Sequence, residues 1–375
     1  VSFDGFLDKS NSKIKEMGIN HLSFTTNSGL VRKFIVIWLI RFLSVLNNNK
    51  IVKRWISTIE TYSALKVAKN ICNDEDQSLI FCSDGELAGF LLFCSNTSGK
   101  KIILGRMEHG RTLSTNNSGR KVKRYIENWL CKIGVRKNKV KFICHVEDLH
   151  KSYEQTGFLG ECVYIPALGI LKPNDVVDKK EARTILNLPK DKTIFLVFGI
   201  GHPGKNYETI VRAIKSMKSN CCVVFAGKSL PVNDAKYLSK KFNCQENTII
   251  FDKYIPPEEH GYFFSSADFS LMSYTKEFVQ DSTVLLDSIK YCLPVIASDT
   301  AWIGKMVKKN GIGTTFKTED HESLEDTINQ TLLLNEDERE KIRNNMKELA
   351  NKNSWENLIN QHIKIFQDTV EVAKQ

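Results

Sequence analysis

Short apolar segments alternate with amphipathic ones through the second half of this sequence. Apolar runs at 193–199, 221–227, 247–251, 269–272 and 294–298 predict strands. The segments between them, such as YETIVRAIKSM and STVLLDSIKYC, have the spacing of helices that bury one face. Strands that alternate with helices predict a parallel sheet covered on both faces, whose ligands bind beyond the carboxyl ends of the strands.

The first half alternates less regularly, but runs at 78–84, 101–107, 140–146 and 162–166 predict further strands. A second α/β domain fits this pattern, because 375 residues are too many for one ordinary domain. The proline-containing segment LKPND predicts a linker, so we expect the N-terminal, acceptor-side domain to cover residues 1–172.

The net charge of +10 belongs entirely to this first half. Residues 1–172 carry 26 Lys and Arg against 15 Asp and Glu, whereas residues 173–375 carry 27 against 28. The asymmetry predicts an anionic partner, such as a phosphorylated substrate or a membrane surface. A solvated basic face that keeps the protein soluble is the alternative. Nucleic acid is disfavoured, because few aromatic side chains interleave with the basic ones.

The ten cysteines are scattered, and none has the C-x-x-C spacing of a zinc site. No secretory signal is recognisable at the start of the sequence. Both observations predict a reducing, cytoplasmic environment rather than a disulfide framework. We also expect no metal and no other cofactor.

The clearest local motif is FGIGHPGKN (198–206), which lies between a predicted strand and a predicted helix. Gly199, Gly201 and Gly204 let the backbone approach a ligand closely, and the helix start offers amide groups to an anion. Lys205 adds a positive charge suited to phosphate. The motif is neither a P-loop nor the dinucleotide fingerprint. A flexible loop with an ordinary surface lysine is the alternative.

Four segments follow one another in the order and spacing of the donor domain of family 4, GT-B-type glycosyltransferases (glycosyl transferases group 1). They are FGIGHPGKN, FAGKS, IIFDKYIPPEEHGYFFSSADFSLMSY and LLDSIKYCLPVIASD, in which Cys292 stands where that family usually has a glycine. NSWENLINQHIKIF (353–366) resembles the family's terminal helix. The resemblance implies an α/β fold of two Rossmann-like domains that face a cleft. The nucleotide-sugar-binding domain would cover 173–355, and a terminal helix over 356–375 would return to the first domain.

The resemblance also implies roles for residues of the second domain. Lys205 would bind the donor diphosphate. Asp287 would accept hydrogen bonds from the ribose hydroxyls, because it occupies the second position of the family's paired glutamates. The first position falls at Val279, with Asp281 nearby. Tyr254 and Ile255 would border the nucleobase. The expected donor-binding residues are Gly199, Gly201, His202, Lys205, Asn206, Tyr254, Ser282, Thr283, Val284 and Asp287.

Two of these residues have a plainer interpretation. His202 stands where the family variant has arginine, and an exposed turn histidine beside Pro203 is the alternative. Asp287 is alternatively an acid on the exposed face of a helix. In the first domain, His109 stands where many family members have a cleft histidine near the transferred sugar. We therefore expect His109, Lys205 and Asp287 to form the catalytic group. Glu108, or a His109 that merely bonds to backbone, remains the alternative.

Residues 34–46 read FIVIWLIRFLSVL between basic residues, a segment too short to span a bilayer. It either lies in the membrane interface, with Trp38 at headgroup depth, or forms a buried helix. Residues 111–141 contain ten further basic residues, from Arg111 to Lys141, and only one acidic residue, Glu127. Together these segments predict peripheral association with the cytoplasmic face of a membrane, and an anionic or lipid-linked glycan acceptor of lipopolysaccharide type.

The sequence thus predicts a glycosyltransferase that moves a sugar from a UDP-sugar or GDP-sugar to a glycan. The resemblance implies retention of configuration. The main task of the protein would be to stabilise the leaving diphosphate and exclude water. Two alternatives share this fold: a nucleotide-sugar epimerase, and a decayed, non-catalytic protein that binds membranes or another anionic partner.

Overall fold

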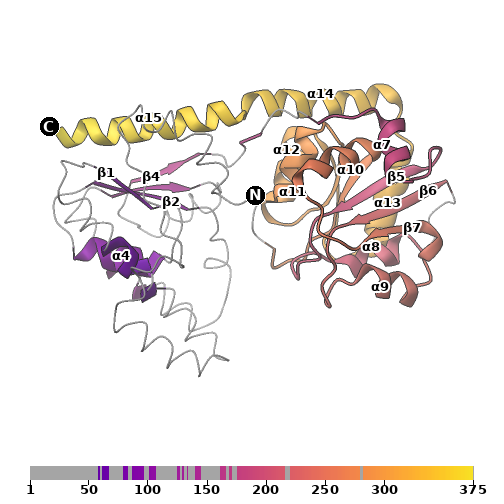
Figure 1. The fold of residues 1–375 in the computed structure, drawn as a ribbon, viewed down its shortest axis with the longest axis horizontal. Helices are drawn as coiled ribbons and strands as arrows, with labels where there is room; N and C mark the ends of the chain where they lie inside the picture. The colour runs from indigo at the N-terminus through magenta and orange to yellow at the C-terminus, as the bar shows by residue number, and fades with distance from the viewer. Residues whose placement is uncertain are drawn as a thin grey trace.

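Two parallel sheets organise the computed structural model (Figure 1). The structure describes residues 58–59, 61–66, 79–82, 87–96, 101–106, 125–126, 129–130, 133, 140–144, 161–165, 169–170, 175–215, 220–278 and 282–374.

The first sheet has the order β1-β2-β3-β4, and every neighbouring pair is parallel. Three of the strands fall inside the predicted runs and β4 begins one residue before its run, which confirms these predictions. Helix α4 (Leu87–Ser95) packs on the sheet, since the rings of Phe90 and Phe142 meet edge to face at 5.8 Å. The strands are β1 (Leu79–Cys82), β2 (Lys101–Arg106), β3 (Val140–Cys144) and β4 (Glu161–Tyr164).

The second sheet has the order β10-β9-β8-β5-β6-β7 and is also parallel throughout. Its first five strands along the chain confirm the predicted runs, whereas β10 was not predicted. The strands are β5 (Thr193–Phe198), β6 (Cys221–Ala226), β7 (Thr248–Phe251), β8 (Phe269–Met272), β9 (Val295–Ser298) and β10 (Gly313–Phe316).

Strand β5 is buried on both faces and carries a different helix layer on each. Phe195 and Val197 point to the layer of α8 (Tyr207–Ala213), α9 (Ala235–Lys241) and α13 (His321–Leu332). Ile194 and Leu196 point to the other layer, where Phe263 of α10 (His260–Ser266) packs. Successive side chains of a strand alternate between faces, so a continuous apolar run is what a strand between two layers requires.

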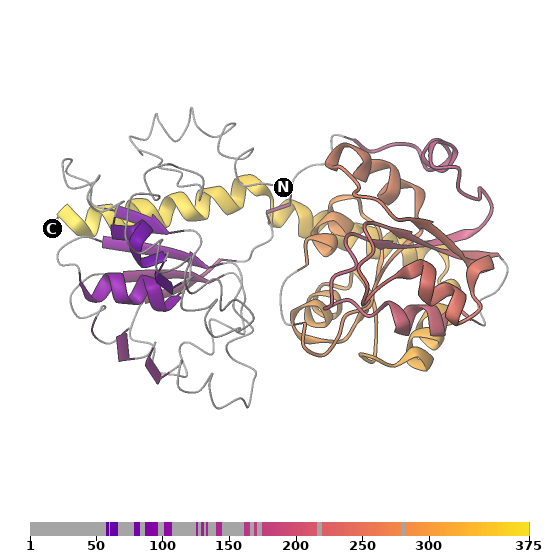
Figure 2. The same cartoon turned by 60° about the horizontal axis from the view of Figure 1, so that its bottom comes forward.

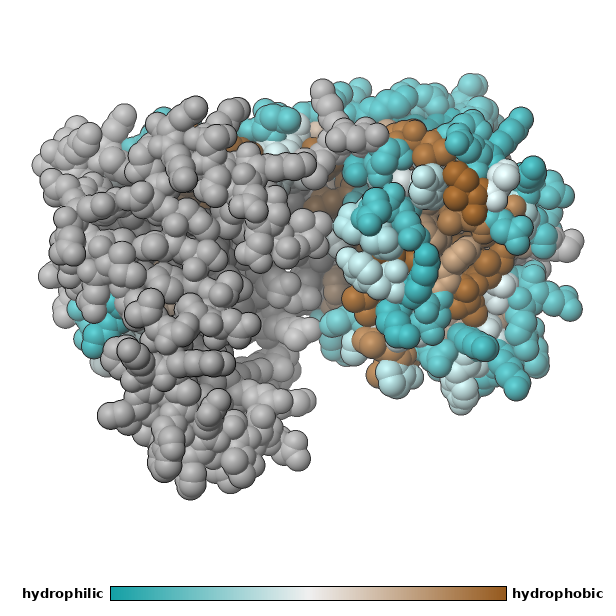
Figure 3. Space-filling view, viewed as in Figure 1, coloured by the Kyte–Doolittle hydropathy of each residue, from teal (hydrophilic) through white to brown (hydrophobic). Residues whose placement is uncertain are grey.

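Two further helices pack beside β8 and β9. Leu285 and Ile289 of α11 (Thr283–Lys290) share a cluster with Ile303 and Val307 of α12 (Ala301–Asn310). Helix α11 confirms the predicted helix in STVLLDSIKYC, whereas α12 was not predicted. Among the described residues, no helix combines the length and apolar character needed to cross a membrane. Figure 3 shows hydrophilic side chains along the upper edge of the C-terminal half, where α14 (Glu336–Lys352) runs.

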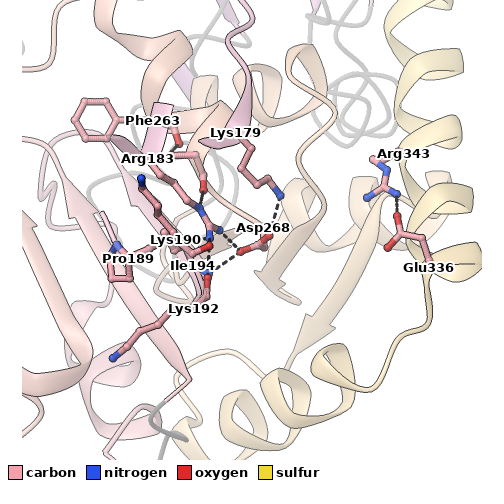
Figure 4. A network of polar contacts seen from close by, with 11 residues as sticks. Lys179, Arg183, Pro189, Lys190, Lys192, Ile194, Phe263, Asp268, Glu336 and Arg343 are labelled. Atoms are coloured by element: carbon pink, nitrogen blue, oxygen red, sulfur yellow. Dashed lines mark hydrogen bonds and ion pairs between the residues drawn. The ribbon is translucent and has the colours of Figure 1, made fainter. Parts of the chain in front are cut away.

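A buried ion pair fastens the amino edge of the second sheet (Figure 4). Arg183 of α7 (Lys179–Ile185) pairs with Asp268 at 2.7 Å and donates to the carbonyls of Ser266, Pro189, Lys190 and Lys192. Asp268 also accepts from the backbone N–H of Ile194 at 2.8 Å. The carbonyls and the carboxylate satisfy the buried guanidinium, so this network is structural and lies at the edge opposite the ligand-binding edge of the sheet.

The last two helices connect the halves. Met346 and Leu349 of α14 pack with the second domain. Helix α15 (Trp355–Lys374) packs Leu358, Ile365 and Phe366 against Ile143 and Ile165 beside the first sheet. Figure 1 shows these two helices end to end along the two domains, and Figure 2 shows α15 along the first one. The predicted return of the terminal helix to the first domain is confirmed.

The chain crosses between the halves twice, and the two crossings touch. The backbone N–H of Ile170 donates to the carbonyl of Asn353 at 3.0 Å, and the N–H of Trp355 donates to the carbonyl of Ile170 at 3.2 Å. Gly169 lies against the indole of Trp355, because a Cβ there would come 2.4 Å from a ring carbon.

Candidate functional site

The candidate site lies where the strand order of the second sheet reverses. Strand β5 has β6 on one side and β8 on the other, so the loops that follow β5 and β8 leave the carboxyl edge in opposite directions. A small pocket opens between them. Its lining is Val197, Phe198, Lys205, Tyr207, Leu271, Met272, Ser273, Tyr274 and Val284.

Glycines allow the loop after β5 to fold back tightly over β6. Gly199 has a φ of +86°, and its N–H donates to the carbonyl of Ala226 at 2.8 Å. Gly227 faces it so closely that a Cβ there would lie 2.4 Å from the carbonyl oxygen of Gly199. The predicted glycine-dependent loop is therefore a fixed turn, in which backbone from two strands is in direct contact.

Asn233 holds the loop from the far side. Its side-chain amide donates to the carbonyls of His202 and Lys205, both at 2.8 Å, and its oxygen accepts from the N–H of Tyr207 at 3.0 Å. Asn233 is only 3% exposed, so all three bonds are shielded from water. The loop is joined to β8 as well, because the N–H of Asn206 donates to the carbonyl of Ser273 at 2.9 Å.

Lys205 turns its side chain inward, into the pocket. Its Nζ donates to the carbonyl of Phe198 and lies 3.2 Å from the position that a Cβ on Gly199 would take. Burial lowers the pKa of Lys205 from 10.5 to about 7. Among the described residues no carboxylate forms an ion pair with this amine. An anion that enters the pocket would supply the missing counter-charge.

Hydroxyl groups surround the rest of the pocket. The Oγ of Ser273 is buried and has no hydrogen-bond partner within the described part of the chain. The Tyr274 hydroxyl lies 2.8 Å from the Oγ of Ser282, and the Tyr207 hydroxyl donates to the carbonyl of Gly199 at 3.3 Å. Burial raises the pKa of Tyr274 to about 12 and that of Tyr207 further, so both phenols stay protonated at neutral pH.

The predicted residues at the start of α11 lie at this edge. Ser282 caps the helix, its Oγ accepting from the N–H of Leu285. Val284, the second residue of the helix, lines the pocket, while Thr283 is exposed. Amide groups at a helix start favour negative charge, and here they lie beside Lys205, which forms no ion pair with any carboxylate that the structure describes.

Asp287 follows Val284 by one turn and is half-buried. Its carboxylate lies 3.8 Å from the Nδ1 of His260, and its side chain is 27% exposed. Desolvation raises the pKa of Asp287, while His260 and Lys290 act in the opposite direction. The ring of His260 meets the ring of Phe198 edge to face at 4.8 Å. Asp287 therefore belongs to the same edge of the sheet as Lys205, with Phe198 between them.

Other predicted residues lie further out. His202 is exposed, and its Nδ1 accepts from the N–H of Gly204 at 3.0 Å. Asn206 caps α8 by accepting from the N–H of Thr209. Tyr254 is 66% exposed, whereas Ile255 packs in the core with Phe263. Gly201 lies against the turn before α9. His109, Glu108, Val279, Asp281 and Trp38 lie outside the described residues.

Sequence reasoning missed three residues of this edge. Asn233 lies outside the four quoted segments, whereas His260 and Ser273 lie inside the third one but were given no role. Only the folded sheet brings all three residues to the loop. Gly227 carried a signal, since FAGKS was one of the quoted segments. Across the described residues, no group of three or more His, Cys, Asp and Glu could hold a metal ion.

Comparisons with known proteins agree with this geometry. Residues 178–349 match the family model described as "Glycosyl transferases group 1". The predicted resemblance is confirmed over this segment, which contains β5 to β10 and all three residues of the Lys205, His260 and Asp287 edge. No curated protein matches the chain.

Solved structures share the fold at low identity. Sucrose-phosphate synthase from Thermosynechococcus elongatus is 16% identical, with a TM-score of 0.65 over 83% of this chain and 77% of its own. Anabaena HepE, solved with UDP, is 13% identical, with a TM-score of 0.65 over 80% and 82%. WaaG, a glycosyltransferase of lipopolysaccharide biosynthesis, is 14% identical, with a TM-score of 0.56 over 80% of each chain. The predicted GT-B fold of two α/β domains is confirmed.

Proposed function

Because residues 178–349 match the group 1 glycosyltransferase model, we propose that this chain transfers a sugar from a nucleoside-diphosphate sugar to a glycan acceptor. The observation that carries the proposal is the inward-facing Lys205 at the strand-order reversal, an amine with no acidic partner among the described residues. Likeness to HepE, solved with UDP, supports a nucleoside diphosphate as the ligand.

In this proposal Lys205 stabilises the negative charge that develops on the leaving diphosphate. The α11 start adds amide groups, and the loop after β5 excludes water. Asp287 accepts from the ribose. Transfer proceeds with retention of configuration, so the acceptor attacks from the face that the diphosphate leaves. The diphosphate itself then takes the acceptor proton. His109 belongs to the acceptor side of this scheme.

The first test is a thermal-shift panel. We expect UDP or GDP to raise the melting temperature, and NAD and ATP to leave it unchanged, because the site carries no dinucleotide fingerprint or P-loop. The nucleotide that protects is then tested as its sugar conjugates, with and without a glycan acceptor. Conversion of the sugar without an acceptor would favour an epimerase. Stabilisation by NAD alone would contradict the assignment.

Substitution of the phosphate residue gives the matching kinetic test. We expect Lys205→Ala to weaken donor binding and lower turnover by at least roughly tenfold, or about 1.4 kcal/mol, through loss of a charge-assisted contact. Asp287→Asn should act mostly on donor affinity. Unchanged kinetics for Lys205→Ala would remove the phosphate-site argument.

A membrane-held, anionic acceptor is the finer part of the proposal. It is supported by the basic excess of residues 1–172 and by three exposed apolar residues in helical positions, Tyr125, Ile126 and Trp129. Tyr125 and Trp129 are 75% and 56% exposed. Lys121, Lys123 and Arg124 precede them directly.

Acidic vesicles test this part. The intact protein should sediment with vesicles rich in phosphatidylserine at low salt, and raised salt should release it, because each Lys or Arg near an anionic surface contributes about 1 kcal/mol. Replacing Lys121, Lys123 and Arg124 with glutamate should abolish sedimentation while UDP binding survives. A wild-type protein that ignores such vesicles at low salt would instead favour a soluble acceptor.

A further inference from the structure

Two side chains from different helices meet beside the carboxyl end of β5. His260 is the first residue of α10, and Asp287 lies in the middle of α11. The Nδ1 of His260 and the Oδ2 of Asp287 are 3.8 Å apart, and the side chains are 23% and 27% exposed. Each is therefore mostly shielded but still reachable from the edge of the sheet where ligands bind.

Neither group forms a hydrogen bond to another described residue. Asp175 lies close to them and provides the contrast: its carboxylate accepts from the Tyr291 hydroxyl at 2.7 Å and pairs with Lys290 at 3.5 Å. Asp287 is the more buried carboxylate, yet among the described residues no donor forms a hydrogen bond to it. A half-buried acceptor without a donor costs free energy, unless a ligand supplies the donor.

The spacing suits a hydroxyl group between the two side chains. At 3.8 Å the ring nitrogen and the carboxylate oxygen are too far apart to bond directly, but both can lie within hydrogen-bond distance of one oxygen. A hydroxyl both donates and accepts, so it can donate to Asp287 and accept from His260. A vicinal diol offers a second hydroxyl to the remaining carboxylate oxygen.

Phe198 connects this pair to the phosphate pocket. Its carbonyl accepts from the Nζ of Lys205, and its ring meets the ring of His260 at 4.8 Å. A ligand with a diol and an adjacent diphosphate could therefore place the diol at His260 and Asp287 and the diphosphate at Lys205, on the two sides of Phe198. Ribose nucleoside diphosphates have this chemistry.

We propose that His260 is a ribose-recognition residue, which binds a sugar hydroxyl of the donor nucleotide together with Asp287. The inference rests on the proposed function, because it assumes that a nucleoside diphosphate occupies the site. It gives a role to His260, to which the resemblance assigned none. It also gives the shorter Asp287 a partner in the place where the family has a longer glutamate.

Matched ligands and variants test the inference by titration calorimetry. The ligands are UDP and GDP with their 2′-deoxy and 3′-deoxy counterparts. His260→Phe keeps a ring against Phe198 but removes both nitrogens, and His260→Gln restores a polar group. Glu259→Gln is the control, since it changes the preceding residue and its exposed pair with Lys253 without touching Asp287.

We expect the wild type to bind the ribonucleotide more tightly than one of the deoxy analogues. His260→Phe should weaken ribonucleotide binding roughly fivefold, the effect of one lost hydrogen bond, and leave the affinity for that analogue unchanged. His260→Gln should recover most of the loss, and Glu259→Gln should behave as wild type. This pattern identifies a direct contact with the hydroxyl.

Two results would overturn the inference while leaving the proposed function intact. One is an equal loss of affinity for ribo- and deoxynucleotides in His260→Phe, which would make His260 a packing residue. The other is no loss for either His260 variant. A wild-type protein that binds none of these nucleotides would contradict the proposed function itself. This outcome differs from the two above, in which the wild type still binds. If His260→Phe does not fold, the same comparison is made with His260→Gln against wild type.

Discussion

At the scale of single residues, the site depends on polar groups that have few or no partners within the described part of the chain. Lys205 has one carbonyl and no carboxylate in the described residues, and the hydroxyl of Ser273 has no partner there. The arginine of the amino edge is the opposite case, since Arg183 satisfies its donors within the protein. The contacts of Arg183 stabilise the fold, whereas the amine of Lys205 can still form an ion pair with a bound anion.

The lowered pKa of Lys205 predicts proton uptake on ligand binding. In the unfolded chain the amine has its ordinary pKa of 10.5, whereas in the folded protein its pKa is about 7. Between these values the unfolded state binds more protons, so this residue makes stability rise with pH from about 7 to 10.5. A bound diphosphate would favour the ammonium form, so binding of UDP at pH 8 to 9 should take up close to one proton.

Titration calorimetry in buffers of different ionisation enthalpy measures this uptake. Lys205→Met removes the amine with little change of shape, and UDP should then bind weakly and without proton uptake. The same uptake in wild type and Lys205→Met would show that another group is the source.

The sequence predicted a glycine-dependent, positively charged loop after β5, but not which residues of other segments contact this loop. Lys205, Gly199 and Asp287 stood out because they belong to local motifs. His260, Asn233 and Ser273 did not, because their distances to the loop depend on strand order, and strand order is set by contacts remote in sequence. The pattern of residue types also could not predict that the Lys205 side chain points inward.

At the scale of elements, the predicted strands and the helices between them are largely confirmed, because each is a strong run with a clear boundary. Strand β10 and helix α12 were not predicted. GTTF is short and polar for a strand, and it pairs only with β9 at one edge of the sheet. Cys292 explains another local feature: it has a φ of +52° just after α11, the left-handed position that glycine adopts without strain. The family's usual glycine at this place therefore has a structural reason.

Asn233 gives the element-scale prediction. Asn233→Asp replaces a double donor with a carboxylate that faces the carbonyls of His202 and Lys205. We expect a loss of about 3 kcal/mol in the free energy of unfolding, since buried acceptors would then repel each other, together with weaker UDP binding. Urea denaturation and titration calorimetry measure the two effects.

Asn310→Asp is the matched control. Its amide also donates to a backbone carbonyl, that of Met306 at 2.9 Å, but it lies on α12 and not at the loop. It should lower stability to a smaller extent and leave UDP affinity unchanged. Equal UDP affinity in Asn233→Asp and wild type would show that the loop does not need this anchor.

At the scale of the whole molecule, the two domains are joined by a pair of crossings rather than by one linker. Ile170 on the outgoing segment bonds to Asn353 and Trp355 on the returning one, and Gly169 fits under the indole. The sequence predicted both the linker region and the returning helix, but not that they touch. Contact between segments about 185 residues apart follows from the fold as a whole.

The crossing predicts an interaction between two substitutions. Gly169→Ala places a methyl group 2.4 Å from the Trp355 ring and should lower the free energy of unfolding by about 1 to 3 kcal/mol through overpacking. Trp355→Ala removes the ring and has its own cost. In the double variant the clash with the ring is gone and only the close approach to Leu358, at 2.7 Å, remains, so the loss should be smaller than the sum of the two single losses.

Denaturation of the four proteins measures this difference. UDP affinity serves as a check on the site, and it should be unchanged in all of them, because the crossing lies away from the edge of Lys205. Strictly additive losses would mean that the indole and residue 169 do not touch in solution.

The return of α15 also bears on the order in which the protein is built during translation. Residues 178–349 are contiguous, so the second domain can fold as soon as they have left the ribosome. The first sheet was synthesised earlier, yet part of its apolar cover, Leu358, Ile365 and Phe366, arrives only with the last helix. The half that emerges first thus receives this part of its core only after the second domain has been synthesised.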